Sequence, residues 1–425
     1  MQNHPLAKKI AAVSSILVFF IMAFEVMIMI SPFAFFFYSV FSPLFNFLGQ
    51  HAATRWLVMF FLPHMILPPT VFLKAVRITG SVLFVAGFLG FTFCALQVYL
   101  GKICKWGIAS KGLYKKIRHP QYLLLGIWGM GMAILWPRFI VLATLSLMFI
   151  LYYFLAKDEE RRMLSQYGDS YQGYMNATGM FFPRALEQRW LKLTQPLTPF
   201  SSFKYIAVPI MIVGLTMGSG VALRQITISS LPFMAQNNLT VIPILPEDKS
   251  VSGDVLQGII TGAANGQIPF IRADKAYLGY VMPPDYVMQG MIADTGGHFH
   301  LFKKHHTIAL ITDWVFHPFE HLRRSPMAHM AAEHQIDPAV ARRRHCPVEI
   351  NQADKACDTC SYRRVILLEV APSQGKHLSV QELLAGKTTR TPVGFIDLDA
   401  DTGKLLKATK VAKGTAWKDV PTPEI

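Results

Sequence analysis

Long apolar windows fill the first half of the chain and stop near residue 225. They cover residues 10–30, 32–49, 56–73, 78–100, 120–136, 138–156 and 205–223. A helix of about 20 apolar residues crosses roughly 30 Å of hydrocarbon, so each window predicts a membrane-spanning helix. Prolines in 32–49 and 56–73 predict interrupted or kinked helices there. The windows 120–136 and 138–156 predict a helical hairpin that turns at Trp136-Pro137-Arg138.

Beyond about residue 225 the pattern becomes that of a polar globular domain. Apolar, β-branched runs at Leu239–Leu245 and Arg364–Val370 predict strands. The runs Val393–Leu398 and Leu405–Val411 flank a turn-rich segment and predict a hairpin. The predicted fold class is therefore an all-α polytopic membrane domain of about six to seven transmembrane helices, followed by a soluble α+β C-terminal domain.

This pattern divides the chain into four predicted parts. They are N-terminal transmembrane helices at 1–74, a membrane catalytic core at 75–192, a final transmembrane helix at 193–224, and a histidine-rich soluble α+β domain with a Cys-x-x-Cys at 225–425. Composition agrees, because the mean hydropathy is +0.33 and only 16% of the residues are charged. A soluble protein of this size has more charge.

The net charge of +15 at first suggests a nucleic-acid partner. Much of the excess, however, lies in short loops between the apolar windows, where basic residues set membrane topology. Residues 102–118 carry six Lys and Arg side chains and no acidic one. Since no nucleic-acid-binding motif accompanies them, we expect membrane lipid with anionic headgroups as the partner, and no nucleic acid.

The same loops predict the orientation of the chain. The basic loop 101–118 and the charged stretch 157–192 lie at the two ends of the predicted hairpin, so both belong on one side, the cytoplasmic side. A single crossing at 205–223 then places the C-terminal domain on the opposite face. The predicted location is the inner membrane of a bacterium, with a periplasmic C-terminal domain.

Two polar segments flank the hairpin and carry the candidate chemistry. The first is GLYKKIRHPQY, from Gly112 to Tyr122. Pro120 suits the first turn of a helix, where its missing N–H costs nothing. Free backbone N–H groups at that helix start, together with Arg118 and His119, predict an anion site that an amino-acid carboxylate would fit.

The second segment, DEERRMLSQYGDSYQGY, begins where the hairpin leaves the membrane. Its Glu159 and Glu160 can accept hydrogen bonds from an ammonium group or a ribose hydroxyl. Tyr167, Tyr171 and Tyr174 recur at i, i+4 and i+7, which predicts one shared face if the segment is helical. Such a face can stack on an adenine or lie beside a sulfonium cation. Together the two segments complement S-adenosylmethionine (SAM).

Each segment alone also fits a plainer interpretation, a topology signal before a helix or an interfacial charge cluster. Their order around an apolar hairpin, with Pro183 beyond, resembles the isoprenylcysteine carboxyl methyltransferase and phospholipid N-methyltransferase superfamily over about residues 75–190. The resemblance implies a helical membrane fold that holds SAM at the cytoplasmic end. The implied cofactor-binding residues are Arg118, His119, Tyr122, Glu159 and Glu160, supported by Tyr171 and Tyr174. Many members have glycine where this chain has Leu124.

The resulting prediction is an integral membrane methyltransferase that acts on a lipid, a prenylcysteine-like or a small thiol or amine acceptor at the interface. His119 is the one candidate base, although anion binding would use the same side chain. The alternative is a membrane-anchored metal-binding or redox domain without methyltransferase activity. A reductase on a similar scaffold would bind NADPH, but no Gly-rich dinucleotide motif favours it. The sequence leaves the acceptor and the oligomeric state open.

The alternative rests on a cluster in the C-terminal half. His345-Cys346 and Cys357-x-x-Cys360 offer four ligands that zinc accepts. In an oxidising compartment Cys357 and Cys360 could instead form a disulfide or redox pair, and inert thiols are the third interpretation. The predicted cofactors are therefore SAM and, in the C-terminal domain, zinc.

Overall fold

The computed structural model divides the chain into two units. The residues described are 5–40, 45–64, 66–104, 111–194, 204–282, 315–323, 362–371 and 378–411. The first unit, here the membrane unit, consists of Met1–Ser42, Leu83–Ala133 and Ile140–Gly218. The second, here the sheet unit, consists of Pro43–Val82, Ile134–Phe139 and Ser219–Ile425. Both units are thus assembled from segments far apart in the sequence, whereas the predicted four parts were continuous.

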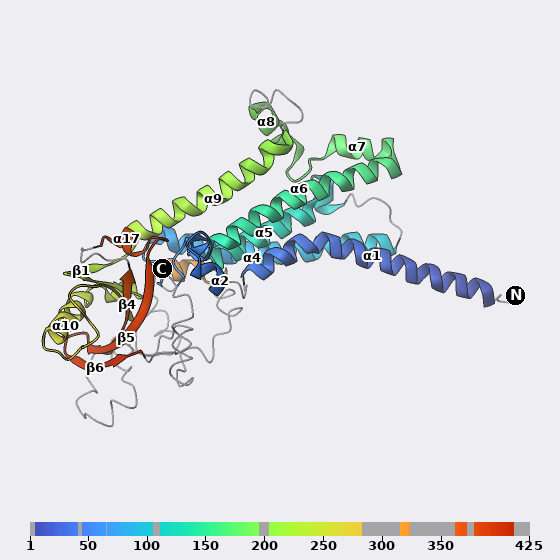
Figure 1. Cartoon of the computed structure of the whole chain (residues 1–425). Helices are drawn as coiled ribbons and strands as arrows, with labels where there is room; N and C mark the ends of the chain where they lie inside the picture. Colours follow the sequence, from blue (N-terminus) through green and yellow to red (C-terminus); the bar gives the residue numbers. More distant parts are fainter. Residues whose placement is uncertain are drawn as a thin grey trace. The chain divides into compact units, whose positions relative to one another are not determined.

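Helices make up most of the described part of the membrane unit, and some of them continue into segments of the sheet unit (Figure 1). They are α1 (Pro5–Val40), α4 (Val71–Ile103), the 3-10 turn η1 (Gly112–Lys115), α5 (Pro120–Leu135), α6 (Phe139–Tyr167), α7 (Asp169–Ala177), α8 (Arg184–Thr194) and α9 (Lys204–Ser230). Among the described residues three helical stretches are long and apolar enough to cross a membrane, Val71–Gly101, Phe139–Tyr167 and Ile206–Ser230. Two more, Val26–Val40 and Pro120–Leu135, are apolar but shorter. The structure therefore supports a helical membrane protein, without confirming six to seven spans.

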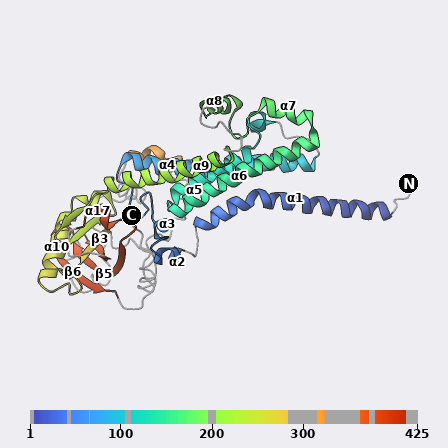
Figure 2. The same cartoon turned by 45° about the horizontal axis from the view of Figure 1, so that its top comes forward.

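The predicted hairpin is confirmed, and glycines set its close packing. A Cβ atom at Gly126 of α5 would lie 2.6 Å from the Phe149 ring of α6. At Gly87 of α4 it would lie 2.4 Å from the backbone nitrogen of Trp128 in α5. Small residues let membrane helices approach to backbone contact. Figures 1 and 2 accordingly show α5 and α6 running side by side.

Leu124, the departure from the family pattern, packs against a glycine of α4. A Cβ atom at Gly90 of α4 would lie 2.7 Å from Leu124 Cδ2. The leucine side chain thus lies directly against the backbone of α4 at this position. We infer that Leu124, at the position where many family members have glycine, makes a contact between α5 and α4.

Two helix predictions near the N-terminus are wrong. The windows 10–30 and 32–49 were expected to be separate spans, but α1 is one helix from Pro5 to Val40 that contains Pro32. The window 56–73 was expected to be a kinked span. Instead the chain has the short helices α2 (Phe45–Gln50) and α3 (Arg55–Val58), and the residues described between α3 and α4 form no helix.

The segment 59–70 is non-helical because its prolines lack the amide that a helix needs, and because it packs into the sheet unit. The Ile66 side chain is fully buried in a core formed largely by strand residues. The Leu67 amide donates to the Ile244 carbonyl over 3.0 Å. Arg224 of α9 donates to the carbonyls of Phe60 and Leu384, which fixes this segment further. The apolar residues of this segment therefore belong to a globular core and do not form a membrane span.

Six described strands form one sheet in the sheet unit, in the order β1-β2-β3-β4-β5-β6. They are β1 (Met234–Gln236), β2 (Leu239–Pro243), β3 (Ala276–Met282), β4 (Tyr362–Ala371), β5 (Thr389–Asp399) and β6 (Leu405–Lys410). The pair β2–β3 is parallel, joined through helix α10 (Ser252–Ala264), and the other pairs are antiparallel. The sequence predicted β2, β4 and the β5–β6 hairpin, which are confirmed, but missed β1, β3 and α10.

Each face of the sheet has its own apolar core, and each also buries an arginine from β4. Arg363 and Arg364 are neighbours in this strand, so their side chains point to opposite faces. Arg363 pairs with Asp248 in the 3-10 turn η4 (Pro246–Lys249), and Arg364 pairs with Asp397 in β5. Both pairs are bidentate, with distances of 2.7–2.9 Å. The remaining described helices are α13 (Pro318–Arg323) and α17 (Val380–Leu383).

Candidate active site

The two predicted polar segments meet within the membrane unit, at the end of the α5–α6 hairpin. A third segment, residues 178–183 between α7 and α8, closes over them, and we call it the strap. Amides of Arg118 and His119 donate to the carbonyls of Gly179 and Met180 over 2.8 and 3.1 Å, and the Gly179 amide donates to Lys116. A Cβ atom at Gly179 would lie 1.8 Å from the Phe182 carbonyl oxygen. Only glycine therefore fits this position of the strap.

Arg118 joins α6 to the strap. Its Nε donates to Glu160 Oε1 over 2.5 Å, and its Nη1 donates to the carbonyls of Thr178 and Met175 over 2.5 and 3.1 Å. The Arg118 and Glu160 side chains are only 10% and 11% exposed. Such a charge-assisted bond in a screened site is strong. The guanidinium group therefore fixes the position of the Glu160 carboxylate.

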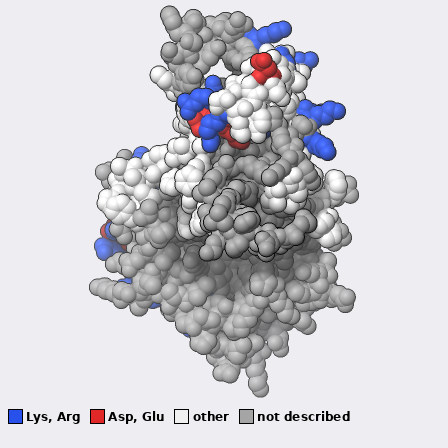
Figure 3. Space-filling view, turned by 90° about the vertical axis from the view of Figure 1, so that its right-hand side faces the viewer, with Lys and Arg blue, Asp and Glu red and all other residues white. Residues whose placement is uncertain are grey.

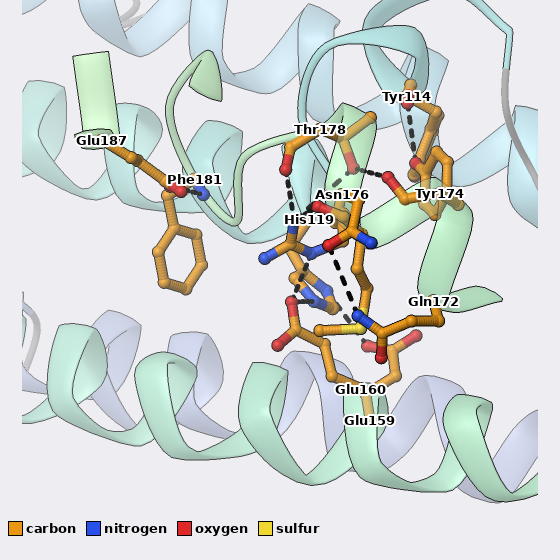
Figure 4. A network of polar contacts seen from close by, with 12 residues as sticks. Tyr114, His119, Glu159, Glu160, Gln172, Tyr174, Asn176, Thr178, Phe181 and Glu187 are labelled. Carbon is orange, nitrogen blue, oxygen red and sulfur yellow. Dashed lines mark hydrogen bonds and ion pairs between the residues drawn. The ribbon is translucent and has the colours of Figure 1, made fainter. Parts of the chain in front are cut away.

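His119 lies between the two carboxylates (Figure 4). Its Nδ1 is 3.4 Å from Glu159 Oε2 and its Nε2 is 3.4 Å from Glu160 Oε1. These are ion-pair contacts without hydrogen-bond geometry, and His119 is only 2% exposed. A carboxylate beside each ring nitrogen favours a proton on both, which is the charged imidazolium.

The pKa of His119 follows from two opposed causes. Burial lowers it, because the charged ring loses its hydration. The contacts with the Glu159 and Glu160 carboxylates raise it and outweigh burial, so that the pKa of His119 lies above its ordinary value. The cluster thus combines the Arg118 cation, a histidine whose protonated form is favoured, and two carboxylates.

Tyr122 extends the cluster toward the membrane. Its hydroxyl donates to Glu159 Oε2 over 3.3 Å. Its ring stacks between His119, at 5.6 Å between ring centroids, and Tyr152 of α6, at 4.8 Å. Three stacked rings therefore run from the charged cluster into the apolar helices. The sequence did not single out Tyr152, because a tyrosine inside an apolar window gives no distinct signal.

The prediction that Tyr167, Tyr171 and Tyr174 share one helix face is wrong. Gly168, with φ of +51°, ends α6 and lets α7 start in a new direction. Tyr167 on α6 is 38% exposed, whereas Tyr171 on α7 is buried. The Tyr174 hydroxyl donates to the Tyr114 carbonyl over 2.7 Å.

Burial shifts the tyrosines of α7 away from ionisation. It raises the pKa of Tyr174 to about 12. Burial and then the charges of Glu160 and Glu159 raise the pKa of Tyr171. Both phenols therefore stay protonated at neutral pH and act as walls or hydrogen-bond donors.

Several residues of the site escaped the sequence analysis. The Tyr114 hydroxyl donates to Gln121 Oε1 over 2.7 Å and ties η1 to α5. Thr178 supplies its carbonyl to Arg118. Glu187 in α8 accepts from the amides of Phe181 and Phe182 over 2.9 and 3.1 Å, which anchors the strap to α8. Tyr114 could have been found, because it lies within the first polar segment. The strap carries no sequence motif that would mark it as part of the site.

The predicted metal ligands His345, Cys346, Cys357 and Cys360 lie outside the described residues. Within the described ranges, no group of three or more His, Cys, Asp and Glu side chains could hold a metal ion. Zinc and the non-methyltransferase alternative therefore receive no support from this part of the chain.

Comparison with known proteins shows a family resemblance for one segment of the chain. Residues 72–170 match the model of the phospholipid methyltransferase family. Comparisons with curated proteins and with solved structures gave no match. The matched segment runs from α4 to the start of α7, and it contains Arg118, His119, Glu159 and Glu160.

The apolar helices and this match together support a membrane methyltransferase. The particular relationship, through residues 72–170, is to the phospholipid methyltransferase family, which confirms the predicted superfamily resemblance. Tyr171, Tyr174 and the strap lie beyond the matched segment.

Proposed function

We propose that this protein transfers a methyl group from SAM to an acceptor at the membrane interface. The acceptor classes are a lipid, a prenylcysteine-like compound, or a small thiol or amine. One observation carries the proposal: the buried cluster of Arg118, His119, Glu159 and Glu160 at the end of the hairpin in the family-matched segment.

The residues present fit SAM. Glu159 has a side chain that is 36% exposed, so this carboxylate can accept from an ammonium group or a ribose hydroxyl. The ring nitrogens of His119 are buried without hydrogen-bond partners and can donate to a bound anion or hydroxyl. Tyr122 offers an aromatic edge beside them. We assign Arg118 and Glu160 the role of holding this arrangement.

SAM, when bound, supplies the electrophilic methyl group. The protein then contributes orientation and exclusion of water, which can account for a large part of a barrier reduction. A protonated His119 is a poor base, because both ring nitrogens already favour a proton. A carboxylate acceptor needs no base, whereas a thiol or amine would lose its proton to water at the interface.

We also infer the orientation of the chain. The basic residues around the cluster support a SAM site on the cytoplasmic side, and a single crossing by α9 would put the C-terminal half in the periplasm of a bacterial inner membrane. Impermeant thiol labelling of intact cells at an introduced Ser170→Cys, in a variant whose five native cysteines are replaced by serine, tests this. The proposal expects protection from the reagent until the membrane is opened, and labelling of intact cells would contradict it.

Calorimetric titration of SAM into purified full-length protein tests the function. We expect saturable binding that Glu160→Gln and Arg118→Ala both weaken. Arg161→Ala is the matched control, since this side chain is 80% exposed and pairs with Asp158. Absence of SAM binding by the unaltered protein would contradict the proposal.

The acceptor is then identified with membranes from a host with and without the chain. Labelled SAM is added, and lipid, protein and small-thiol fractions are counted separately. A fraction labelled only when the chain is present names the acceptor class.

A further inference from the structure

Helix α8 has one apolar and one basic side, and nothing described covers it. Phe182 before the helix and Leu186 within it are 54% and 53% exposed. In the sequence Leu186, Trp190 and Leu193 follow i, i+4, i+7 spacing, which places them on one face of a helix. Such a face is costly in water and favourable at a lipid boundary.

The charges of α8 match an anionic surface. Arg184, Arg189 and Lys192 are all exposed. The one acidic residue of the helix, Glu187, is turned to the strap, where it accepts two amide hydrogen bonds. The exposed charged side chains of α8 are therefore all basic.

The basic character continues on neighbouring elements of the membrane unit. Lys111, Lys115 and Lys116 are exposed in and around η1, and Arg161 is exposed on α6. Figure 3 shows Lys and Arg side chains gathered in the upper part of that view, with few acidic ones among them. Juxtamembrane basic groups of this kind are attracted to anionic lipid.

The strap connects α8 to the cluster. Glu187 holds the amides of Phe181 and Phe182. The ring of Phe181 lies 6.1 Å from the ring of His119. The strap carbonyls bind the amides of Arg118 and His119. A displacement of α8 is therefore passed directly to the covering of the site.

We propose that α8 lies in the headgroup layer of an anionic phospholipid membrane and, from there, holds the strap over Arg118 and His119. Its apolar face contacts the acyl boundary, and Arg184, Arg189 and Lys192 contact lipid phosphates. A bilayer is favoured over a soluble partner protein, because α8 is joined to a unit whose helices are apolar and long enough to span one. The position of α8 does not depend on the proposed function. Only the idea that the strap covers a SAM site rests on it.

Photocrosslinking tests the placement of α8. Full-length protein carrying benzoylphenylalanine in place of Leu186 is reconstituted in nanodiscs of phosphatidylcholine with increasing phosphatidylglycerol. We expect lipid adducts that increase roughly fivefold with phosphatidylglycerol and fall again in the triple variant Arg184→Glu, Arg189→Glu, Lys192→Glu. The matched position is the exposed, polar Ser170 on α7, where few adducts should form. Adducts at 186 that do not exceed those at 170, or that ignore phosphatidylglycerol, overturn the proposal.

Amide hydrogen exchange in the same nanodiscs tests the connection to the strap and needs no SAM. The amides of Phe181 and Phe182 should exchange more slowly with phosphatidylglycerol present, and the triple variant should lose this protection. Arg161→Glu is the control, since it removes an exposed charge of similar kind outside α8, and it should keep the protection. Equal exchange in both lipids would overturn the coupling, whereas failure of SAM to bind would overturn only the proposed function.

Discussion

The membrane unit and the sheet unit both bury arginine beside carboxylate, but they use the pair differently. In the sheet unit Arg363 and Arg364 each meet one aspartate in a bidentate pair that occupies both oxygens of the acid. In the membrane unit Arg118 gives only its Nε to Glu160, and His119 stands 3.4 Å from Glu159 and from Glu160.

The difference distinguishes a structural ion pair from the proposed binding site. A saturated pair leaves no atom for a ligand, and it stays because breaking it would strand a buried charge. The membrane cluster holds His119 by longer ion-pair contacts that do not meet hydrogen-bond geometry, and it has a Glu159 carboxylate that water or a ligand can reach. Residue types alone do not distinguish the two cases, whereas their hydrogen-bond saturation does.

The largest effect should come from breaking a saturated pair. Asp397→Asn leaves the Arg364 guanidinium buried beside a neutral amide, so the free energy of unfolding of the sheet unit should fall by about 3–5 kcal/mol. Pulse proteolysis of the full chain across a urea series measures it. Asp401→Asn, at the exposed hairpin turn, should change it by less than about 0.5 kcal/mol. Equal effects of the two substitutions would refute the structural assignment.

Glu160→Gln should act on binding instead. The amide keeps the shape of the side chain but loses a charge-assisted bond worth about 1.5–3 kcal/mol, so SAM affinity should fall roughly 10- to 100-fold. Titration calorimetry measures it, and the urea midpoint of the sheet unit should stay unchanged. Asp158→Asn on the same helix, 43% exposed, is the control. An unchanged SAM affinity in Glu160→Gln would contradict the assignment of this cluster to the SAM-binding site.

Gly179→Ala should have a smaller effect through the strap. Its methyl group would meet the Phe182 carbonyl, so the strap must shift at a cost of about 1–3 kcal/mol, and SAM affinity should fall roughly 5- to 10-fold. Gly173→Ala is the matched control, because its Cβ atom meets nothing within 4 Å and it lies inside helix α7. That variant should keep its affinity. Equal losses in both would argue against a role for the strap.

The smallest effect concerns pH. Because the folded pKa of His119 is raised, the stability from its contacts is fully present below the unfolded value of about 6.5 and is lost as pH rises through the folded pKa. The groups that face it are Glu159, Glu160, Arg118 and Tyr122. The difference in thermal midpoint between the unaltered protein and His119→Gln should therefore shrink from pH 6 to pH 9. A difference that widens with pH would show that His119 is buried neutral.

Much of the site was predictable, because its two motifs are local in sequence. GLYKKIRHPQY and EERR each place their side chains within one or two helical turns, and the intervening apolar length demands a hairpin. The partner of Arg363, in contrast, is Asp248, 115 residues away. Nothing in a local pattern marks that pairing.

The wrong predictions share a cause. Hydrophobic length was taken as a membrane signal in the window 56–73, but a globular core also needs apolar residues. The tyrosine spacing predicted one shared face only for a continuous helix, and the positive φ of Gly168 ends α6. Sequence periodicity describes a segment alone, whereas both outcomes depend on what the segment packs against.

The burial of Ile66 beside strand residues also means that this segment can pack only after the strands have been synthesised. Leu67 and its partner Ile244 are separated by nearly 180 residues. At typical elongation rates of about 5–20 residues per second, the segment waits on the order of ten to thirty seconds for its partner. During that interval an apolar stretch of the nascent chain lacks the strands against which it packs. We therefore expect a chaperone to bind it until those strands are made.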